Sequence, residues 1–594
     1  MDIQQQIKNK VVDALQSLFQ HKANDKTIQL SETRKEFVGD ITIMVFPFLK
    51  ASKQGPEETG EAIGEYITKQ IEAITGYNVV KGFLNLEIED SVWFDSFKQM
   101  LTDEQFGTFP SNGKKVVLEY CGPNTNKPLH FGHIRNMMIG YSTANILSAV
   151  GYEVHKVNIL NDRGIAICKS MLGWQKFADG ATPETANKKG DHFVGDYYVA
   201  FSKKEKAEIA ELVQSGMAKK EAEGATPILM EAREMLLKWE AGDEATLALW
   251  NKMNNWVFEG FNKTYNRLGV DFEKDYRESD YYLLGKSIVE KGLRNEIFYQ
   301  NEDGSIWIDL SDEGLDNKLL LRSDGTSVYL TQDLGIAQER AKDFNLGKDD
   351  LSIYVVGDEQ NYHFKVLQKT LKKLGKEYAD GIHHQGYGMV DLPGGAKMKS
   401  REGTSVDADE LMDEMVNKAG EVAQELGKIA DLSNVEKEKL FEQIGLGAMK
   451  YFILKVNPKK RMIFDPEKSI DLVGHTGPFI QYSYARIQSL CKKAENTSLE
   501  INVSKLETAE KELIKFMGNY PNKVQAAAQQ YDPSEIANYA YELAKLYNKF
   551  YAELPILNAP KEASKHFRIM LSKQVANVLH KSMTLLGIDM PERM

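Results

Sequence analysis

Residues 115–160 read KVVLEYCGPNTNKPLHFGHIRNMMIGYSTANILSAVGYEVHKVNIL. The run at 114–120 is apolar and β-branched, which is typical of a buried strand. A loop rich in Pro, Asn and Gly follows, and residues 133–151 then show apolar side chains at helical spacing, with Gly151 as a stop. Residues 152–160 have the pattern of a second strand. This order predicts a βαβ unit, and therefore a parallel sheet with a ligand crevice at the strand ends.

The rest of the chain divides around this unit. Residues 1–110 combine an opening helix with short strand-like runs, which indicates a small α+β domain. Residues 111–405 are expected to form an α/β domain, because strand patterns resume at SIYVVGDEQ and HHQGYGMVDL. Between the βαβ unit and these later strand patterns, a charged and largely helical stretch at about 165–315 has the character of an insertion between two halves of the sheet. Amphipathic helices then dominate, in a connecting segment at 406–470 and an all-α bundle at 471–594.

Composition excludes several classes of protein. The 594 residues suggest three or four domains, and 42% hydrophobic with 27% charged residues is typical of globular chains. No apolar run approaches the ~18 residues of a membrane helix, and the first twenty residues lack the features of a secretory signal. The three cysteines are far apart without a CxxC pair, which argues against disulfides and zinc. We therefore expect a cytoplasmic protein without membrane association.

The net charge of −12 argues against indiscriminate nucleic-acid binding. The charge is uneven, because residues 471–594 hold 15 Lys and Arg against 13 Asp and Glu, a balance of +2. The remainder therefore carries −14, and the C-terminal bundle is the part least repulsive to phosphate.

The sequence His130-Phe131-Gly132-His133 lies at the predicted start of the helix. Histidines three positions apart share a helix face, and a glycine lets a ligand approach the backbone closely. A helix N-terminus supplies free N–H donors and partial positive charge, so phosphate is its natural ligand. Paired histidines here could equally be a cap or a surface pair, but the strand–loop–helix context favours phosphate binding.

A second motif, KMKSREGT at 397–404, follows the glycine-rich turn LPGG. Its three cations and two hydroxyls suit a polyphosphate whose negative charge grows in a transition state. The alternative is a solvated surface loop. The order of the two motifs, at opposite ends of one α/β region, favours the functional interpretation.

These motifs resemble the HIGH and KMSKS motifs of the class I aminoacyl-tRNA synthetases. Phe131 replaces the Ile of the first, and KMKSR lacks the lysine at the fourth position of the second. Arginyl-tRNA synthetases characteristically lack that lysine, and a lysine just ahead of their HIGH motif is thought to compensate. Lys127 occupies that place here.

Wider matches to the arginyl family cover nearly the whole chain. EYCGPNTNKP resembles its E-x-S-S-P-N-x-x-K-P motif, although Cys121 and Gly122 replace the two serines. The segments RESDYY, SDGTSVYLTQDLGIAQER and YVVGDEQNYHF resemble its arginine-binding segments. GHTGPFIQYSYARIQSL and LLGIDMPERM resemble its anticodon-binding domain, and VGDITIMVFPFLK and KGFLNLEI its N-terminal domain. The resemblance implies a Rossmann-like catalytic core between a tRNA-contacting α+β domain and a helical anticodon-binding bundle.

The resemblance also implies the site residues. Those expected to act in catalysis are His130, His133, Lys127, Lys397 and Arg401. Those expected to bind ATP are His130, Gly132, His133, Lys127, Lys397, Met398 and Ser400. Those expected to bind arginine are Glu119, Pro123, Asn124, His133, Glu278, Tyr329, Asp333 and Gln360. A guanidinium is planar and always charged, and carboxylates with an aromatic ring over its face are its natural partners.

The implied activity is ligation of L-arginine to tRNA(Arg) through arginyl-adenylate, with adenylate formation only when tRNA is bound. ATP with Mg²⁺, L-arginine and tRNA(Arg) are the expected substrates, the enzyme is expected to be a monomer, and neither zinc nor another protein-bound metal is expected. For Glu119 a structural role at the strand end remains open, as does an i,i+4 helical pair for Tyr329 and Asp333. The rival functions are another class I synthetase, a small nucleotidyltransferase, and a non-catalytic RNA-binding paralogue.

Overall fold

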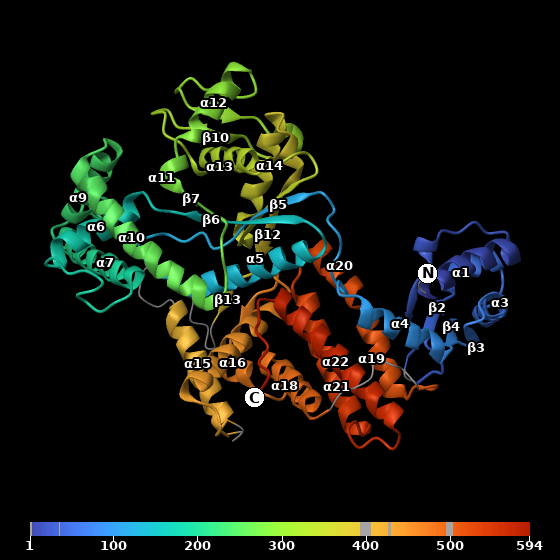
Figure 1. Ribbon diagram of the computed structural model, residues 1–594. Coiled ribbons are helices and arrows are strands. Elements are labelled where there is room, and N and C mark those ends of the chain that lie inside the picture. The colour runs from blue at the N-terminus through green and yellow to red at the C-terminus, as the bar shows by residue number, and fades with distance from the viewer. Residues whose placement is uncertain (1–2, 35, 392–405, 426–428, 495–502) are drawn as a thin grey trace. The chain divides into compact units, whose positions relative to one another are not determined.

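The computed structural model describes residues 3–34, 36–391, 406–425, 429–494 and 503–594 (Figure 1). The larger of its two compact units comprises Gly107–Ser489, Tyr520–Lys545 and Ala576–Met594. The smaller unit comprises Met1–Phe106, Leu490–Asn519 and Leu546–Val575. Among the described helices, none combines the length and the apolar character that crossing a bilayer requires.

The larger unit is built on a five-stranded parallel sheet of order β12–β11–β5–β6–β7 (Figure 1). The strands are β5 (Lys115–Glu119), β6 (Glu153–Leu160), β7 (Lys274–Arg277), β11 (Leu351–Gly357) and β12 (Ile382–Tyr387). β5 pairs with β6 on one side and with β11 on the other. The chain order therefore reverses beside β5, and open α/β sheets bind ligands at such a switch point.

Helix α5 (Phe131–Ala149) connects β5 to β6 and packs closely on the sheet. A Cβ at Gly140 would lie 2.4 Å from the Cβ of Tyr120, so only glycine allows this approach. Tyr120 is fully buried at the end of the strand, and its hydroxyl donates to the carbonyl oxygen of Asp271 at 2.6 Å. The predicted βαβ unit and parallel sheet are confirmed.

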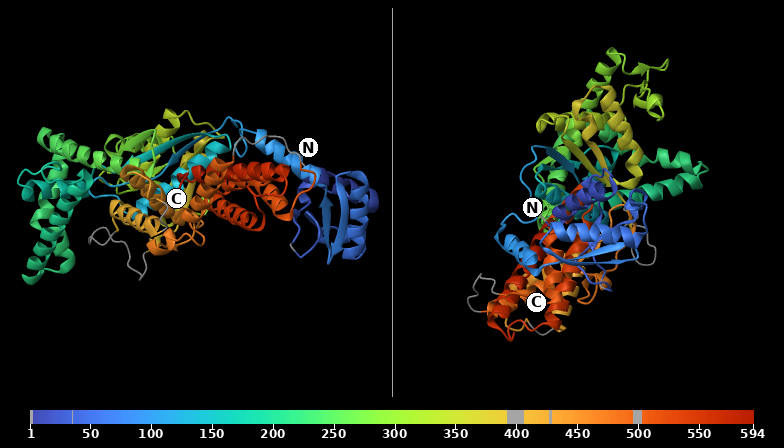
Figure 2. Two further views of the ribbon diagram at one scale, coloured as in Figure 1. Left: turned by 60° about the horizontal axis from the view of Figure 1, so that its bottom comes forward. Right: turned by 90° about the vertical axis from the view of Figure 1, so that its right-hand side faces the viewer.

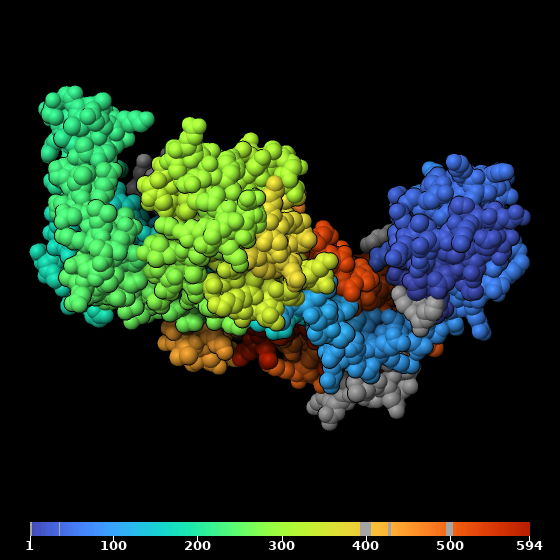
Figure 3. Space-filling model, turned by 90° about the horizontal axis from the view of Figure 1, so that it is seen from above, coloured from blue at the N-terminus to red at the C-terminus, as the bar shows by residue number. Residues whose placement is uncertain are grey.

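The range 165–315, expected to be a helical insertion, is helical mainly over its first part. Its long helices form the teal-to-green column at the left of Figure 3. The helices are α6 (Ile165–Phe177), α7 (Gly190–Gln214), α8 (Lys219–Ala225), α9 (Pro227–Glu240) and α10 (Glu244–Leu268). β7 then returns to the main sheet, where Val157 pairs with Lys274 and Leu160 with Arg277.

A second, antiparallel sheet of order β10–β9–β8 follows β7. Its core includes the fully buried Leu320, Leu334 and Leu367. The elements of this region are α11 (Glu278–Tyr281), α12 (Leu284–Arg294), β8 (Tyr299–Gln300), β9 (Ile306–Ile308), β10 (Lys318–Leu321), α13 (Tyr329–Asp343) and α14 (Asn361–Lys373). This packing fixes α13, which carries Tyr329 and Asp333, and α11, which carries Glu278, contacts α13.

The C-terminal part of the chain is helical, as expected, and is drawn in orange to red in Figure 2. Its longer helices are α15 (Ala408–Glu425), α16 (Asn434–Leu454), α18 (Gly477–Lys493), α19 (Thr508–Gly518), α20 (Tyr520–Gln530), α21 (Ser534–Glu553) and α22 (Glu562–Leu585). The range 471–594 contributes helices to both units. A short parallel pair, β13 (Val390–Asp391) with β14 (Met462–Ile463), joins the segment after β12 to the segment before α18.

The smaller unit contains the predicted N-terminal α+β elements. An antiparallel sheet of order β1–β2–β4–β3 lies with helices α1 (Ile3–Phe19), α3 (Pro56–Gln70) and α4 (Asp90–Thr102). The strands are β1 (Leu30–Glu32), β2 (Ile41–Met44), β3 (Ile74–Val80) and β4 (Phe83–Ile88). Lys81 and Gly82 both have positive φ, 51° and 77°, as a two-residue hairpin of type I′ requires.

Candidate active site

A cavity of about 600 Å³ lies at the carboxyl ends of β5 and β11, at the switch point of the main sheet. Its lining includes the loop after β5, the start of α5 and the β13 segment. Four predicted site residues line it, namely Glu119, His130, Gly132 and His133. A cavity of this size is typical of a small-molecule site.

The loop after β5 enters the cavity through two residues in the left-handed region. Cys121 has φ 82° and Gly122 has φ 62°. The N–H of Cys121 donates to Oδ1 of Asn136 at 2.6 Å, and the N–H of Gly122 donates to Oδ1 of Asn158 at 3.1 Å. Burial raises the pKa of the Cys121 thiol to about 12, so this cysteine is not a nucleophile. The two asparagines, which the sequence did not single out, hold the loop in this unusual shape.

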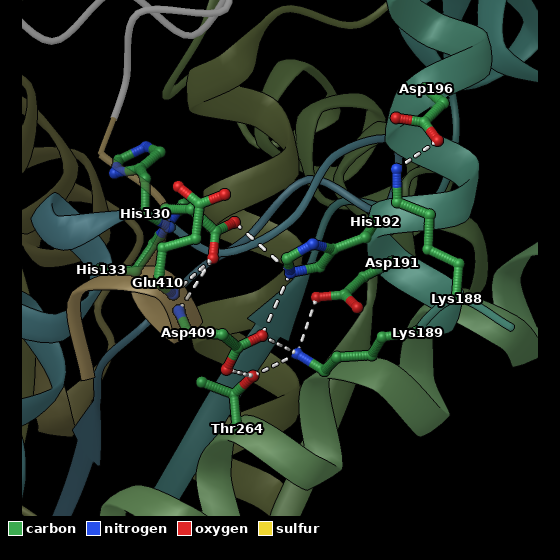
Figure 4. Close-up of polar contacts among 11 residues, drawn as sticks. His130, His133, Lys188, Lys189, Asp191, His192, Asp196, Thr264, Asp409 and Glu410 are labelled. Atoms are coloured by element: carbon green, nitrogen blue, oxygen red, sulfur yellow. Dashed lines mark hydrogen bonds and ion pairs between the residues drawn. The ribbon is translucent and has the colours of Figure 1, made fainter. Parts of the chain in front are cut away.

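The rings of His130 and His133 lie together at the N-terminal end of α5, with centroids 3.9 Å apart (Figure 4). Nδ1 of His130 accepts from the N–H of Gly132, and Nδ1 of His133 accepts from the N–H of His130, each at 3.1 Å. An accepting Nδ1 carries no proton, so each neutral ring bears its proton on Nε2. Each ring therefore caps the helix with one nitrogen and offers an N–H donor on the other.

Both histidines are neutral at pH 7. Burial, and then the charge of Lys127, lowers the pKa of His130 to about 4. Burial, and then the charges of His130 and Lys127, lowers the pKa of His133 well below its usual value. A Cβ at Gly132 would lie 2.9 Å from Cε1 of His130, so glycine is needed for the cap. The site thus presents two neutral donors beside a lysine, a combination suited to phosphate oxygens.

Two arginines that the sequence analysis missed also belong to this site. Arg135 is buried on α5, and its guanidinium donates to the carbonyl oxygens of Pro458 at 3.1 Å and Lys460 at 2.7 Å. These bonds fix the backbone beside Arg461, which lines the cavity. Neither residue gave a sequence signal, because Arg135 lies within an apolar helix and Arg461 within the cationic run NPKKR.

The three residues predicted to bind a guanidinium lie within electrostatic reach of one another. Burial raises the pKa of the Glu278 carboxyl, and the negative charge of Asp333 adds to this shift. Partial loss of water around the Tyr329 hydroxyl raises its pKa, and the negative charges of Glu278 and Asp333 add to this shift. The Tyr329 side chain is 80% exposed, so a ligand can reach it. The lining of the 600 Å³ cavity does not include these three residues.

Asp333 has an ion-pair partner that was not predicted. Its Oδ2 lies 2.5 Å from Nε2 of His363 on α14, and this hydrogen bond is the main reason that the pKa of His363 is raised. The pair fixes the half-buried carboxylate between α13 and α14. The histidine stands in the segment already singled out for Gln360, but its spacing alone gave no signal.

Glu119 forms a buried ion pair with Arg340 on α13. Only 1% of Arg340 is exposed, and its guanidinium lies 5.0 Å from the ring centroid of Tyr276 and 5.1 Å from that of Tyr354. The structural role that the sequence left open for Glu119 is therefore present, although the residue also lines the cavity.

The remaining predicted residues lie in loops. The carbonyl oxygen of Pro123 accepts from the N–H of Asn161 at 3.0 Å, and Asn124 forms an isolated parallel bridge with Asn161. Gln360 is exposed at the end of η4 (Asp358–Gln360), the short 3-10 helix that follows β11. The whole second motif, 397–404, lies outside the described residues, and with it the predicted site residues Lys397, Met398, Ser400 and Arg401.

Comparison with known families agrees with this geometry. Residues 97–465 match the family described as tRNA synthetases class I (R), catalytic domain. Residues 480–594 match the DALR anticodon binding domain, and residues 5–88 match the Arginyl tRNA synthetase N terminal domain. The sheet, its switch-point cavity and the histidine motif are thus those of a class I aminoacyl-tRNA synthetase.

Individual relatives show which family within this class the chain resembles. The arginine–tRNA ligase of Bacteroides thetaiotaomicron is 52% identical over the full length of both chains, and that of Flavobacterium psychrophilum is 50% identical, again over both full lengths. The arginyl-tRNA synthetase structure from Thermus thermophilus superposes with a TM-score of 0.78 at 23% identity over 99% of each chain. The structure from Plasmodium falciparum gives 0.75 at 19% identity, over 100% of this chain and 99% of that one. The chain belongs to the arginyl-tRNA synthetase family.

Proposed function

We propose that this protein is an arginine–tRNA ligase, which forms arginyl-adenylate from L-arginine and ATP and then transfers the arginyl group to tRNA(Arg). The observation that carries the proposal is the pair of Nε2–H donors on His130 and His133, placed at the N-terminus of α5 in the switch-point cavity. Membership of the arginyl-tRNA synthetase family identifies arginine as the amino-acid substrate. ATP enters with Mg²⁺ on its phosphates, as part of the substrate.

In the first step, an oxygen of the arginine carboxylate attacks the α-phosphorus of ATP. The bond from that phosphorus to the bridging oxygen breaks, and pyrophosphate leaves with its Mg²⁺. His130 and His133 donate from Nε2 to the phosphate oxygens, while Lys127 places positive charge beside them. The second motif, with Lys397, Met398, Ser400 and Arg401, supplies further cations and hydroxyls to the same phosphates. The protein thus positions the two substrates and neutralises the charge of the phosphates, and it forms no covalent bond to either substrate.

Recognition of the arginine side chain falls to Asp333, Glu278 and Tyr329. Two carboxylates match the forked donors of a guanidinium, and an aromatic ring matches its flat face. Lysine would leave hydrogen bonds unmade at the same carboxylates, which carries a large penalty in a partly buried site. Asn124, Gln360 and His133 then hold the backbone end of the substrate, and Glu119 and Pro123 lie in the same pocket.

In the second step, the 2′-hydroxyl of the terminal tRNA adenosine attacks the carbonyl carbon of the adenylate, and AMP leaves. The helical bundle after residue 471 binds the anticodon stem and loop, and residues 1–110 contact the tRNA elbow. Adenylate formation requires bound tRNA, and the enzyme acts as a cytoplasmic monomer. The +2 balance of residues 471–594, in a chain of net charge −12, is consistent with a tRNA surface there.

Pyrophosphate exchange into ATP tests this proposal. The assay is run with each amino acid, with and without total tRNA, and exchange is expected only with arginine and only when tRNA is present. Exchange with another amino acid would overturn the assignment of Asp333, Glu278 and Tyr329. Absence of exchange with any amino acid, with tRNA binding retained, would identify a non-catalytic RNA-binding paralogue.

Arg461 provides a prediction that the sequence did not suggest. Because it lines the cavity beside the histidines, Arg461→Met is expected to raise the KM for ATP about tenfold, the loss of one charge-assisted contact. The KM for arginine should change less than twofold. Lys459→Met removes an exposed cation from the same run and serves as the control. Equal ATP constants for the two variants would exclude Arg461 from ATP binding.

A further inference from the structure

The helical insertion packs directly behind the ATP-binding end of α5. A Cβ at Gly195 on α7 would lie 2.8 Å from Cδ of Pro128 and 3.6 Å from Cα of Lys127. Helix α7 therefore touches the segment that leads into His130. The sequence of the insertion carries no motif that indicates a role, and this contact links it to the site.

A cluster of polar side chains lies beside this contact (Figure 4). Nζ of Lys189 lies 2.5 Å from Oδ2 of Asp409, and it also donates to Oγ1 of Thr264 at 2.5 Å. Nε2 of His192 lies 3.1 Å from Oδ2 of Asp409 and 3.3 Å from Oδ2 of Asp407. These five residues, here called the Lys189 cluster, join α7 and α10 of the insertion to the start of α15.

The backbone at Asp407 pairs directly with the backbone at His130. The N–H of Phe131 donates to the carbonyl oxygen of Val406, and the N–H of Ala408 donates to that of Leu129, each at 3.0 Å. Asp407 and His130 thus face each other in an antiparallel bridge. The position of Asp407 therefore determines the position of the His130 backbone, because only this pair of hydrogen bonds separates them.

The cluster, with the neighbouring Asp191, already contains a lysine at the place where a metal ion would lie. Ligand atoms of Asp191, His192 and Asp409 lie within 4.8 Å of one another, as in a metal site. The ammonium of Lys189, however, lies 3.2 Å from Asp191 and 2.5 Å from Asp409, so it provides the positive charge there. Although burial opposes it, hydrogen bonds from His192 and Lys189 lower the pKa of Asp409, which is therefore ionised at pH 7.

We propose that the Lys189 cluster is a positioning element for adenylate formation, because it fixes Asp407 and so the backbone that aims His130 and His133 at the phosphates. This inference rests on the proposed function, since it assigns the histidines to ATP. None of the five residues lines the 600 Å³ cavity, so the cluster acts through the pairing of residues 406–408 with 129–131. It also gives the insertion a role, which is to support the catalytic end of α5 from behind.

Matched pairs of variants test the cluster in the full-length enzyme. Lys189→Met and Asp409→Asn remove its central ion pair. Lys188→Met and Glu410→Gln change neighbouring residues outside it; Lys188 pairs with Asp196 instead (Figure 4). In arginine- and tRNA-dependent exchange, the two cluster variants are expected to lower kcat about ten- to a hundredfold, with the KM for arginine changed less than twofold. The controls should stay within twofold of wild type.

Two variants of His192 distinguish a positioning role from a general role in folding. His192→Gln keeps an N–H donor near the position of Nε2 and should retain most of the activity, whereas His192→Leu should lose it to the same extent as Asp409→Asn. Melting temperatures and active-site titration accompany the kinetics. Normal kcat per titrated site in the cluster variants, or equal activity for the Gln and Leu variants, would overturn the proposal. Wild-type exchange tests the proposed function separately, since it does not depend on these variants.

Discussion

Replacing Asp333 with asparagine is expected to lower kcat/KM for arginine by about a hundred- to a thousandfold. The change keeps the shape of the side chain and removes the charge that a guanidinium needs. Truncating one partner of a hydrogen-bonded charge pair costs about 2–5 kcal/mol, and each 1.4 kcal/mol is a factor of about ten. The measurement is arginine-dependent exchange in the presence of tRNA, with the KM for ATP expected to change less than twofold.

Asp343→Asn is the matched control for this prediction. Asp343 is the last residue of α13, the helix that also carries Asp333, and it forms an ion pair with Lys274 at 2.6 Å. The control therefore removes a paired carboxylate from the same helix without touching the arginine side of the site. Wild-type constants for arginine in Asp333→Asn would show that the guanidinium binds elsewhere.

His130→Asn is expected to lower kcat about a hundred- to a thousandfold while leaving the enzyme folded. Asparagine is a favourable N-cap residue, so the cap that His130 now provides through Nδ1 is retained. The Nε2–H donor is lost, and removing one preorganised donor from developing charge typically costs that factor. Single-turnover adenylate formation with tRNA bound measures the effect directly.

His130→Ala completes the comparison, because alanine removes both the cap and the donor. Its kcat should match that of the asparagine variant, while the free energy of unfolding falls by a further ~1 kcal/mol for the lost cap. If the asparagine variant forms adenylate at the wild-type rate, the histidine serves the helix and not the phosphates.

Local sequence patterns were sufficient to predict the strands and the helix at the centre of the larger unit. The strand at 114–120, the helix at 133–151 and the strand at 152–160 each show their own periodicity, and the structure has β5, α5 and β6 there. β7 was absorbed into the predicted insertion because its sequence, KDYR, buries only Tyr276. Such a strand is defined by its parallel partner β6, which is more than a hundred positions away.

The same limit applies to the site. The histidine motif was visible because its residues lie within one turn of helix. The ion pair of Asp333 with His363 spans 30 positions, and that of Lys189 with Asp409 spans 220. Contacts of this kind depend on how sheets and helices pack, which residue spacing does not encode. The guanidinium-binding residues were reached through family resemblance, and their assignment to arginine stays a prediction.

The buried pair of Glu119 and Arg340 constrains how this sequence can change over time. Replacing either partner alone would leave the other charge buried and unpaired between β5 and α13. This would lower the free energy of unfolding by about 3–5 kcal/mol, which is a large part of the stability of an ordinary domain. Drift through single substitutions is therefore blocked at both positions. Among homologous sequences, positions 119 and 340 should be retained together or exchanged together, and an unmatched carboxylate or guanidinium should be rare at either one.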